Sequence, residues 1–157
     1  HSNLRRQRQM CIRDRSKTIK MKNILVLCTG NSCRSQIAHG YLFKFLSSKA
    51  KIYSAGVETH GVNQNAIESM GRDGVDISNY SSNNVNEYRD INFDFVITVC
   101  DHARESCPIM PIQTAVQIHK NFKDPSKIIN SKNVQNDYDI CRDEIKKLII
   151  KIKNRYF

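Results

Sequence analysis

The sequence lacks any long apolar run: none of its stretches approaches the roughly 20 apolar residues that a membrane-spanning helix requires. It also lacks a Cys-x2-Cys pair and the basic-then-apolar pattern of a secretory signal, which argues against a zinc knuckle and against export. The 157 residues, 39% hydrophobic and 25% charged, suit one globular domain with a real core. We therefore expect a cytoplasmic protein without a membrane segment.

The positive charge of the chain is unevenly distributed. The formal net charge is +10, but residues 1–20 contain seven Lys and Arg against one Asp, so the remainder carries about +4. We interpret residues 1–20 as a basic N-terminal extension that is disordered or a sequence artefact, and residues 21–157 as a single domain. With that extension set aside, the charge gives no reason to expect a nucleic-acid partner.

The six cysteines do not form the pattern of a disulfide scaffold. Cys11 lies in the basic extension, which leaves five in the domain, an odd number. Without a secretory signal, such a set indicates a reducing compartment and reactive thiols.

Apolar periodicity predicts an α/β fold. Strand patterns over residues 23–28, 52–56, 93–100 and 115–118 alternate with helical patterns over 35–49, 63–71 and the C-terminal stretch. Residues 78–86 read as a loop leading into a short helix, residues 101–106 as a polar segment, and residues 123–126 as a turn. We expect a small doubly wound parallel sheet of about four strands, flanked by helices. Its ligand should bind at the carboxyl ends of the strands, where Cys28 and Cys100 would share one rim.

The segment from Cys28 to Ser35 is the strongest candidate for a chemical site. A strand–loop–helix unit aims backbone N–H groups and a helix N-terminus at one point, which suits a tetrahedral oxyanion. There Cys28 would be a thiolate nucleophile stabilised by the Ser35 hydroxyl, and the Arg34 fork would match two oxygens. The alternative is a buried strand-end cysteine beside a solvated arginine. The predicted oxyanion-binding residues are Thr29, Gly30, Asn31, Ser32, Cys33 and Arg34.

The same eight residues resemble the phosphate-binding loop of the low-molecular-weight tyrosine phosphatase fold, and most closely its thioredoxin-coupled arsenate reductase branch. The likeness continues through residues 53–63, 96–100, 107–111, 124–125 and 142–145, and so extends from Met21 to the C-terminus. It implies a phosphatase-like fold that binds a phosphate-like or arsenate oxyanion.

The resemblance further implies a thiol relay. Cys28 attacks arsenate, Asp124 protonates the leaving oxygen as general acid, and Cys100 then attacks Cys28 and releases arsenite. Cys107 attacks Cys100, and thioredoxin reduces the disulfide that results. The polar segment between Cys100 and Cys107, if flexible, would let one thiol swing toward the other. The relay requires no organic cofactor and no catalytic metal.

Other interpretations stay open at this point. The chain could be a low-molecular-weight tyrosine phosphatase using Cys28, Arg34 and Asp124, or a non-catalytic redox or oxyanion sensor that binds a partner through residues 100–107. Cys100 and Cys107 could also be a core and a loop cysteine, and Asp124 a turn residue before proline. Phosphatases of this fold place an aromatic residue after the Asp-Pro pair, and Ser126 stands there instead.

Some relatives hold a potassium ion beside the loop with a carboxylate from the first helix. Here His39 occupies the helix position and Asn83 another expected acidic position, so potassium binding is not expected. We also expect a monomer. Structural or surface roles are predicted for the remaining candidates, Cys33 (a loop support), Cys141, His60 and His119.

Overall fold

The structure, a computed structural model, describes residues 20–106 and 115–157. Four strands form one parallel sheet in the order β2-β1-β3-β4. Their bounds are β1 Lys22–Cys28, β2 Ala50–Gly56, β3 Phe95–Thr98 and β4 Val116–His119. The expected four-stranded parallel α/β architecture is therefore confirmed. The expected boundary of a basic extension at residue 20 lies at the edge of the described residues and stays a prediction.

Strand β1 is the centre of the sheet because it is apolar along nearly its whole length. Ile24 to Leu27 are at most 1% exposed, as a strand covered on both faces requires. On one side Cys28 pairs with Gly56, the last residue of β2; on the other side Leu27 pairs with Thr98, the last residue of β3. The carboxyl ends of three strands thus meet where the loop after Cys28 begins.

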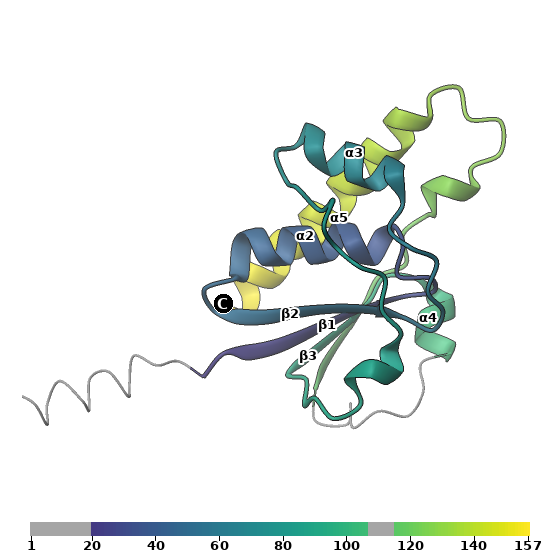
Figure 1. The fold of residues 1–157 in the computed structure, drawn as a ribbon. Helices are drawn as coiled ribbons and strands as arrows, with labels where there is room; N and C mark the ends of the chain where they lie inside the picture. The colour runs from purple at the N-terminus through teal and green to yellow at the C-terminus, as the bar shows by residue number, and fades with distance from the viewer. Residues whose placement is uncertain (1–19, 107–114) are drawn as a thin grey trace, which may run out of the picture.

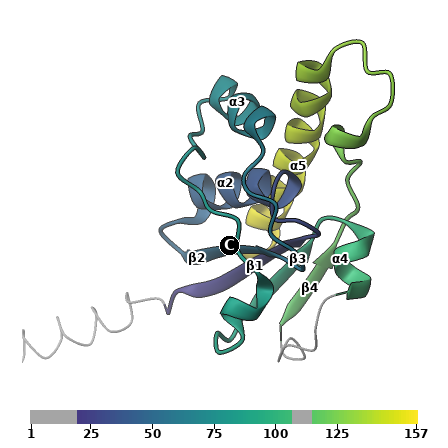
Figure 2. The same cartoon turned by 45° about the vertical axis from the view of Figure 1, so that its right-hand side comes forward.

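Among the described residues, the α-helices are α2 Arg34–Leu46, α3 Gln64–Arg72, α4 Asp101–Ser106 and α5 Val134–Tyr156. Figures 1 and 2 show α2, α3 and α5 gathered on one side of the sheet, while α4 lies apart from them and packs against β1 and β3. Two short 3-10 helices, η1 Val85–Tyr88 and η2 Pro125–Lys127, complete the fold. Among the described residues, no helix is both long and apolar enough to span a bilayer.

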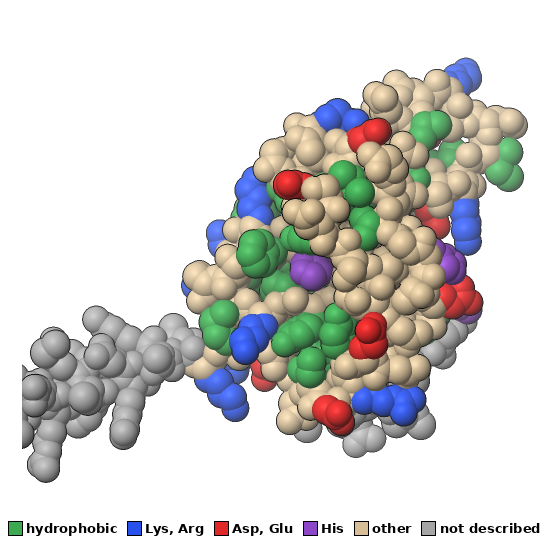
Figure 3. All heavy atoms as spheres, in the orientation of Figure 1, with side chains coloured by type: hydrophobic (Ala, Val, Ile, Leu, Met, Phe, Trp, Pro, Cys, Tyr) green, Lys and Arg blue, Asp and Glu red, His purple; other side chains and the backbone are tan. Residues whose placement is uncertain are grey.

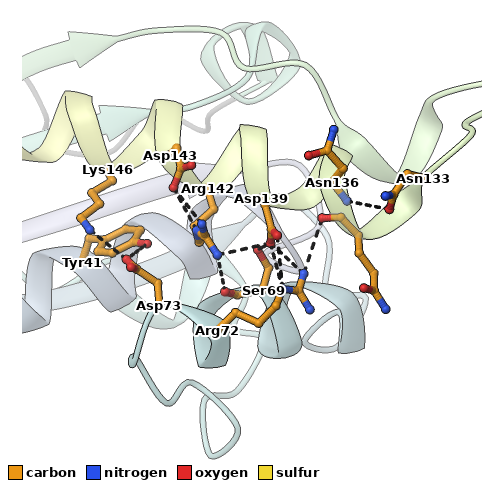
Figure 4. Close-up of polar contacts among 11 residues, drawn as sticks. Tyr41, Ser69, Arg72, Asp73, Asn133, Asn136, Asp139, Arg142, Asp143 and Lys146 are labelled. Atoms are coloured by element: carbon orange, nitrogen blue, oxygen red, sulfur yellow. Dashed lines mark hydrogen bonds and ion pairs between the residues drawn. The ribbon is translucent and has the colours of Figure 1, made fainter.

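Hydrogen bonds and ion pairs join the three gathered helices (Figure 4). On α5, Asp139 accepts hydrogen bonds from Ser69 Oγ at 2.6 Å and from Arg72 Nη2 at 2.7 Å, both on α3. The hydroxyl of Tyr41 on α2 donates to Asp73 at 2.7 Å, just after α3. Because Ser69 and Tyr41 are fully buried, their hydroxyls depend on these partners.

Two expectations about individual elements need correction. Residues 101–106, predicted only as a polar and flexible segment, form helix α4. Its first turn accommodates the Cys100 thiol as an acceptor for the Ala103 N–H at 3.4 Å, a contact that the sequence pattern does not reveal. The third strand spans Phe95–Thr98 and is shorter than the expected residues 93–100; just before it, the Asp94 carboxylate accepts a hydrogen bond from the Asn23 N–H at 2.8 Å.

The surface carries charge of both signs. On the face drawn in Figure 3, the Lys and Arg side chains lie spread around the outline, with Asp and Glu among them and small apolar patches between. The residues that the structure describes therefore place no concentrated charge on this face.

Candidate active site

The loop between β1 and α2 takes its shape from Asn31. This residue has φ +46°, in the left-handed region that asparagine tolerates better than most residues, and its side chain is fully buried. Asn31 Oδ1 accepts from Ser35 Oγ at 2.8 Å and from Gln36 Nε2 at 3.1 Å. Its Nδ2 donates to the Ser54 carbonyl on β2 at 3.2 Å. One amide therefore ties the loop to the following helix and to the neighbouring strand.

The loop carbonyls are bonded from outside the loop. Thr29 O accepts from Glu58 N at 2.9 Å and Gly30 O accepts from His60 N at 3.0 Å. Ser32 O accepts from Asn63 N at 2.9 Å. The three carbonyls are therefore satisfied by backbone N–H groups of the segment that follows β2.

The N–H groups of residues 30–33, by contrast, make no hydrogen bond to another part of the described chain. Buried or half-buried N–H groups left free in a loop at a helix N-terminus are the donors that bind a tetrahedral anion. These donors are compatible with the predicted oxyanion cradle, which stays a prediction.

Arg34 closes the cradle. Its side chain is buried, with Nη1 donating to the Phe122 carbonyl at 2.8 Å and Nη2 lying 3.5 Å from Asp124 Oδ2. Nε of the same guanidinium is buried and has no hydrogen-bond partner among the described residues. A buried donor without a partner is rare in native proteins, and an anion oxygen in the cradle would supply one.

Asp124 is oriented by the turn that follows it. Its Oδ1 accepts hydrogen bonds from Ser126 N at 2.9 Å and from Ser126 Oγ at 2.6 Å, so it caps the short helix η2. Its Oδ2 faces Arg34. Asp124 is therefore a turn residue that also lines the pocket, and its role as general acid stays a prediction. Ser126, standing where an aromatic was expected, orients this carboxylate.

These groups surround a pocket of about 140 Å³. It is lined by Cys28, Thr29, Gly30, Ser32, Cys33, Arg34, His60, Asn63, Asp124, Ser126 and Lys127. His60, interpreted from the sequence as structural or surface, lines the pocket although its side chain is 56% exposed. Lys127 adds a positive group to the pocket wall, and nothing in the sequence pattern identified it.

Cys28 and Cys100 form a pair. Each thiol shifts the pKa of the other, and Cys100 Sγ lies 3.3 Å from Oγ1 of Thr29, the residue next to Cys28. The interaction with Cys28 lowers the pKa of the Cys100 thiol to about 5. The same interaction, together with burial, raises the pKa of Cys28, while Arg34 and the Thr29 N–H lower it. The pair shares one proton, so one of its two sulfurs readily becomes a thiolate. Cys107, the third relay cysteine, lies outside the described residues.

Three further predictions concern residues beside the pocket. The Ser35 hydroxyl donates to Asn31 at 2.8 Å and so shapes the loop instead of stabilising the Cys28 thiolate directly, which corrects the expected contact. Cys141 is buried on α5, and burial raises its pKa to about 12. Burial also raises the pKa of Cys33, so both thiols remain protonated and unreactive at neutral pH.

The surroundings of Asn31 do not fit a potassium site with a carboxylate ligand. His39 is hydrogen-bonded to Ser54 Oγ at 2.8 Å, and burial lowers its pKa to about 4, which keeps the ring neutral. Asn83 contributes its carbonyl to Asn31 Nδ2 at 3.4 Å. Within residues 20–106 and 115–157, no three His, Cys, Asp or Glu side chains gather as a set of metal ligands.

Comparison with known proteins supplies the context for this geometry. Arsenate reductase 2 of Staphylococcus epidermidis is 41% identical over 134 residues, which cover 85% of this chain and 98% of that protein. A solved structure described as an arsenate reductase in oxidized state superposes with a TM-score of 0.75 at 24% identity, over 86% of this chain and 98% of the other.

A low molecular weight protein tyrosine phosphatase from T. tengcongensis superposes with a TM-score of 0.72 at 23% identity, over 85% of this chain and 99% of that one. At such identities the two structures bear on the fold alone. The model of the low molecular weight phosphotyrosine protein phosphatase family matches residues 23–156. The chain therefore belongs to the low molecular weight phosphotyrosine protein phosphatase family, with relatives named arsenate reductase at 41% identity.

Proposed function

We propose that this protein reduces arsenate to arsenite by a relay through Cys28, Cys100 and Cys107, with thioredoxin as the external reductant. The observation that carries the proposal is the second thiol: Cys100 Sγ lies 3.3 Å from Oγ1 of Thr29, the residue next to Cys28 at the base of the oxyanion cradle. A phosphatase needs one nucleophile, whereas reduction of arsenate needs two electrons and therefore two thiols. Relatives named arsenate reductase support the same activity.

In the first step the Cys28 thiolate attacks arsenic and forms a sulfur–arsenic bond. One arsenic–oxygen bond breaks, and its oxygen leaves as water after taking a proton from Asp124, whose Oδ2 faces the same pocket. The loop N–H groups and Arg34 hold the remaining oxygens. Arsenic is still pentavalent at this point.

In the second step Cys100 attacks Cys28 Sγ. The new sulfur–sulfur bond replaces the sulfur–arsenic bond, whose electron pair stays on arsenic, so arsenic becomes trivalent and leaves as arsenite. Cys107 then attacks Cys100 and frees Cys28 as a thiolate. The dithiol of thioredoxin reduces the Cys100–Cys107 disulfide and is itself oxidised.

Helix α4 constrains the last exchange. Along the axis of α4, Cys100 and Ser106, the last residue of the helix, are about 9 Å apart at 1.5 Å per residue. A disulfide allows about 7 Å at most. We infer that α4 has to open when Cys107 attacks Cys100.

The phosphatase alternative keeps one specific observation in its favour. Arg34 and Asp124 are 3.5 Å apart in a pocket that also suits a phosphate monoester. Slow hydrolysis of aryl phosphates would then accompany arsenate reduction. The third candidate, a non-catalytic sensor of redox state or oxyanions, would bind the anion without turnover. In each case we place the protein in the cytoplasm as a monomer without an organic cofactor or a catalytic metal.

Arsenate-dependent consumption of NADPH with thioredoxin and thioredoxin reductase tests the proposal, alongside hydrolysis of an aryl phosphate. Cys100→Ser and Cys107→Ser should each abolish arsenate turnover and spare most of the hydrolysis, whereas Cys28→Ser should abolish both. Cys141→Ser is the matched control, because this buried cysteine lies outside the relay, and it should retain both activities. Normal arsenate turnover by Cys100→Ser or Cys107→Ser would overturn the relay; anion binding without any turnover would identify a sensor.

A further inference from the structure

His119 joins three elements around Cys100. It is the last residue of β4, and its Nδ1 lies 2.6 Å from the hydroxyl of Thr98, the last residue of β3. Its Nε2 lies 2.7 Å from Oδ1 of Asp101, the first residue of α4. Both ring nitrogens therefore have a partner, and these partners, Thr98 and Asp101, flank Val99 and Cys100 in the sequence.

The chain that follows His119 continues this attachment. Lys120 N donates to the Thr98 carbonyl at 3.1 Å, and Phe122 N donates to the Val99 carbonyl at 3.1 Å. The Asp101 N–H is bonded by the Asn121 side chain at 3.2 Å. The turn that carries Cys100 is thus held against the segment from His119 to Phe122.

Cys100 depends on the first turn of α4. Its thiol accepts the Ala103 N–H at 3.4 Å, and this contact exists only while that turn is formed. Helix α4 has six residues, and an isolated helix of that length is unstable because nucleation costs more than a few hydrogen bonds return. Its first turn therefore needs an attachment to the rest of the fold, and the His119–Asp101 contact supplies one.

We propose that His119 is a positioning residue for Cys100: with Thr98 and Asp101 it forms a clasp that fixes the first turn of α4 and aims the Cys100 thiol at Cys28. The consequence for turnover rests on the proposed reductase function. Because the clasp holds only the beginning of α4, the rest of the helix is free to open for the Cys107 exchange while Cys100 stays in place. The clasp would therefore act on the relay steps and not on the attack by Cys28.

The test compares His119→Ala with three other variants of the full chain. His119→Gln can still reach Asp101 with an amide, Asp101→Ala removes the other partner, and His102→Ala removes an exposed histidine of the same helix. Three properties are measured: thioredoxin-coupled arsenate turnover, aryl phosphate hydrolysis, and the rate at which iodoacetamide alkylates Cys100 as a function of pH, read by peptide mass spectrometry. Asp101 is 65% exposed, so its replacement provides a test should His119→Ala fail to fold.

We expect His119→Ala to lower arsenate turnover about tenfold while hydrolysis stays within about twofold, because misplacing a reacting group by about 1 Å can cost as much as about 100-fold. Alkylation of Cys100 should move to higher pH, since the Ala103 N–H would no longer favour its thiolate. His119→Gln should recover part of both effects, and His102→Ala should change neither. The double variant of His119 and Asp101 should be no worse than either single variant, as expected for one shared contact.

Equal loss of reduction and hydrolysis in His119→Ala would overturn the proposal, since it would mark a general structural role. Additive effects of the two replacements, or an unchanged alkylation profile, would do the same. If the unmodified protein hydrolyses aryl phosphate but does not turn over arsenate, the proposed function fails. In that case the pH profile of Cys100 alkylation, measured for the single and double variants of His119 and Asp101, still decides whether the clasp positions Cys100.

Discussion

Replacement of Gly56 tests how strand β2 supports the loop between β1 and α2. It ends β2 and pairs with Cys28. A Cβ added to Gly56 would lie 2.4 Å from the Glu58 carbonyl oxygen, 2.7 Å from Asn31 N and 2.7 Å from the Thr29 carbonyl oxygen. All three atoms belong to the backbone, and two belong to the loop itself. Gly56→Ala therefore cannot be accommodated by turning a side chain; the loop has to move.

The size of the effect follows from the contacts. Each falls several tenths of an ångström below 3.0 Å, a limit that real Cβ atoms essentially never cross. Overpacking of this kind typically costs about 1–3 kcal/mol, and backbone neighbours place Gly56→Ala near the upper end, at about 2–3 kcal/mol. For a domain of this size that corresponds to a fall in Tm of about 6–9 °C. Displaced loop N–H groups should also lower aryl phosphate hydrolysis at least about tenfold.

The chain provides a matched control in Gly71. This residue lies within α3, and a Cβ added there would have nothing within 4 Å. Gly71→Ala should therefore stabilise the protein by about 0.5–1 kcal/mol, because alanine favours the helix, and should leave hydrolysis unchanged. Thermal unfolding followed by circular dichroism gives both Tm values, and the same samples serve for the kinetics.

Two results would refute this reasoning. If Gly56→Ala melts within about 1 °C of the parent and retains full activity, the loop does not rest on β2 as described. If Gly71→Ala is destabilised as much as Gly56→Ala, the loss reflects glycine replacement in general and not the contact with the loop.

Three more predictions concern the hydrogen bonds that join the helices and the loop. Tyr41→Phe should cost about 1 kcal/mol in urea unfolding, because it removes the 2.7 Å hydrogen bond to Asp73; an unchanged unfolding midpoint would contradict it. The Tyr41 hydroxyl and then Lys146 lower the pKa of Asp73, so this carboxylate stabilises the fold above the ordinary aspartate pKa of about 4 and loses that contribution as the pH falls through its lowered folded value. Unfolding free energies measured from pH 6 to 2 should therefore fall less steeply for Tyr41→Phe than for the parent, and parallel curves would refute the assignment. Asn31→Ala should cost about 2–3 kcal/mol and most of the activity, because the buried Ser35 hydroxyl and Gln36 amide lose their shared acceptor; full activity at an unchanged Tm would show that the loop does not need it.

Much of the fold could be predicted from the sequence because its signals are local. The apolar run of β1 ends at Cys28 and a helical pattern follows at once, so the strand–loop–helix unit and its chemistry can be inferred without coordinates. Alternation of such units then predicts a parallel sheet, which brings Cys28 and Cys100 to one rim. The structure bears out this topology, and it places Cys100 Sγ 3.3 Å from the hydroxyl of Thr29, the residue next to Cys28.

What could not be predicted depends on contacts between residues distant in sequence. Gln36 donates to the Ser81 carbonyl at 3.0 Å across 45 residues, and no local pattern points to that partner. The position of Ser35 in the motif predicts a hydrogen bond from its hydroxyl to Cys28. The hydroxyl donates instead to the buried side-chain amide of Asn31. Helix α4 has no apolar stripe of its own, since the Cys100 thiol and the His119 clasp support its first turn. The role of His60 in the pocket wall likewise depends on a turn that only the folded chain brings over Gly30.

The contact between Arg34 and the Phe122 carbonyl has a consequence for the order of assembly. It joins residues 88 positions apart, and Cys28 acquires its Cys100 neighbour only through the pairing of β1 with β3. During synthesis Cys28 and Arg34 therefore leave the ribosome long before the segments that bury them. Contacts of such sequence separation form late, since a long loop must close first. Catalytic activity should therefore return only when folding is complete. In a partly synthesised chain the Cys28 and Cys33 thiols are exposed, and no pocket surrounds them.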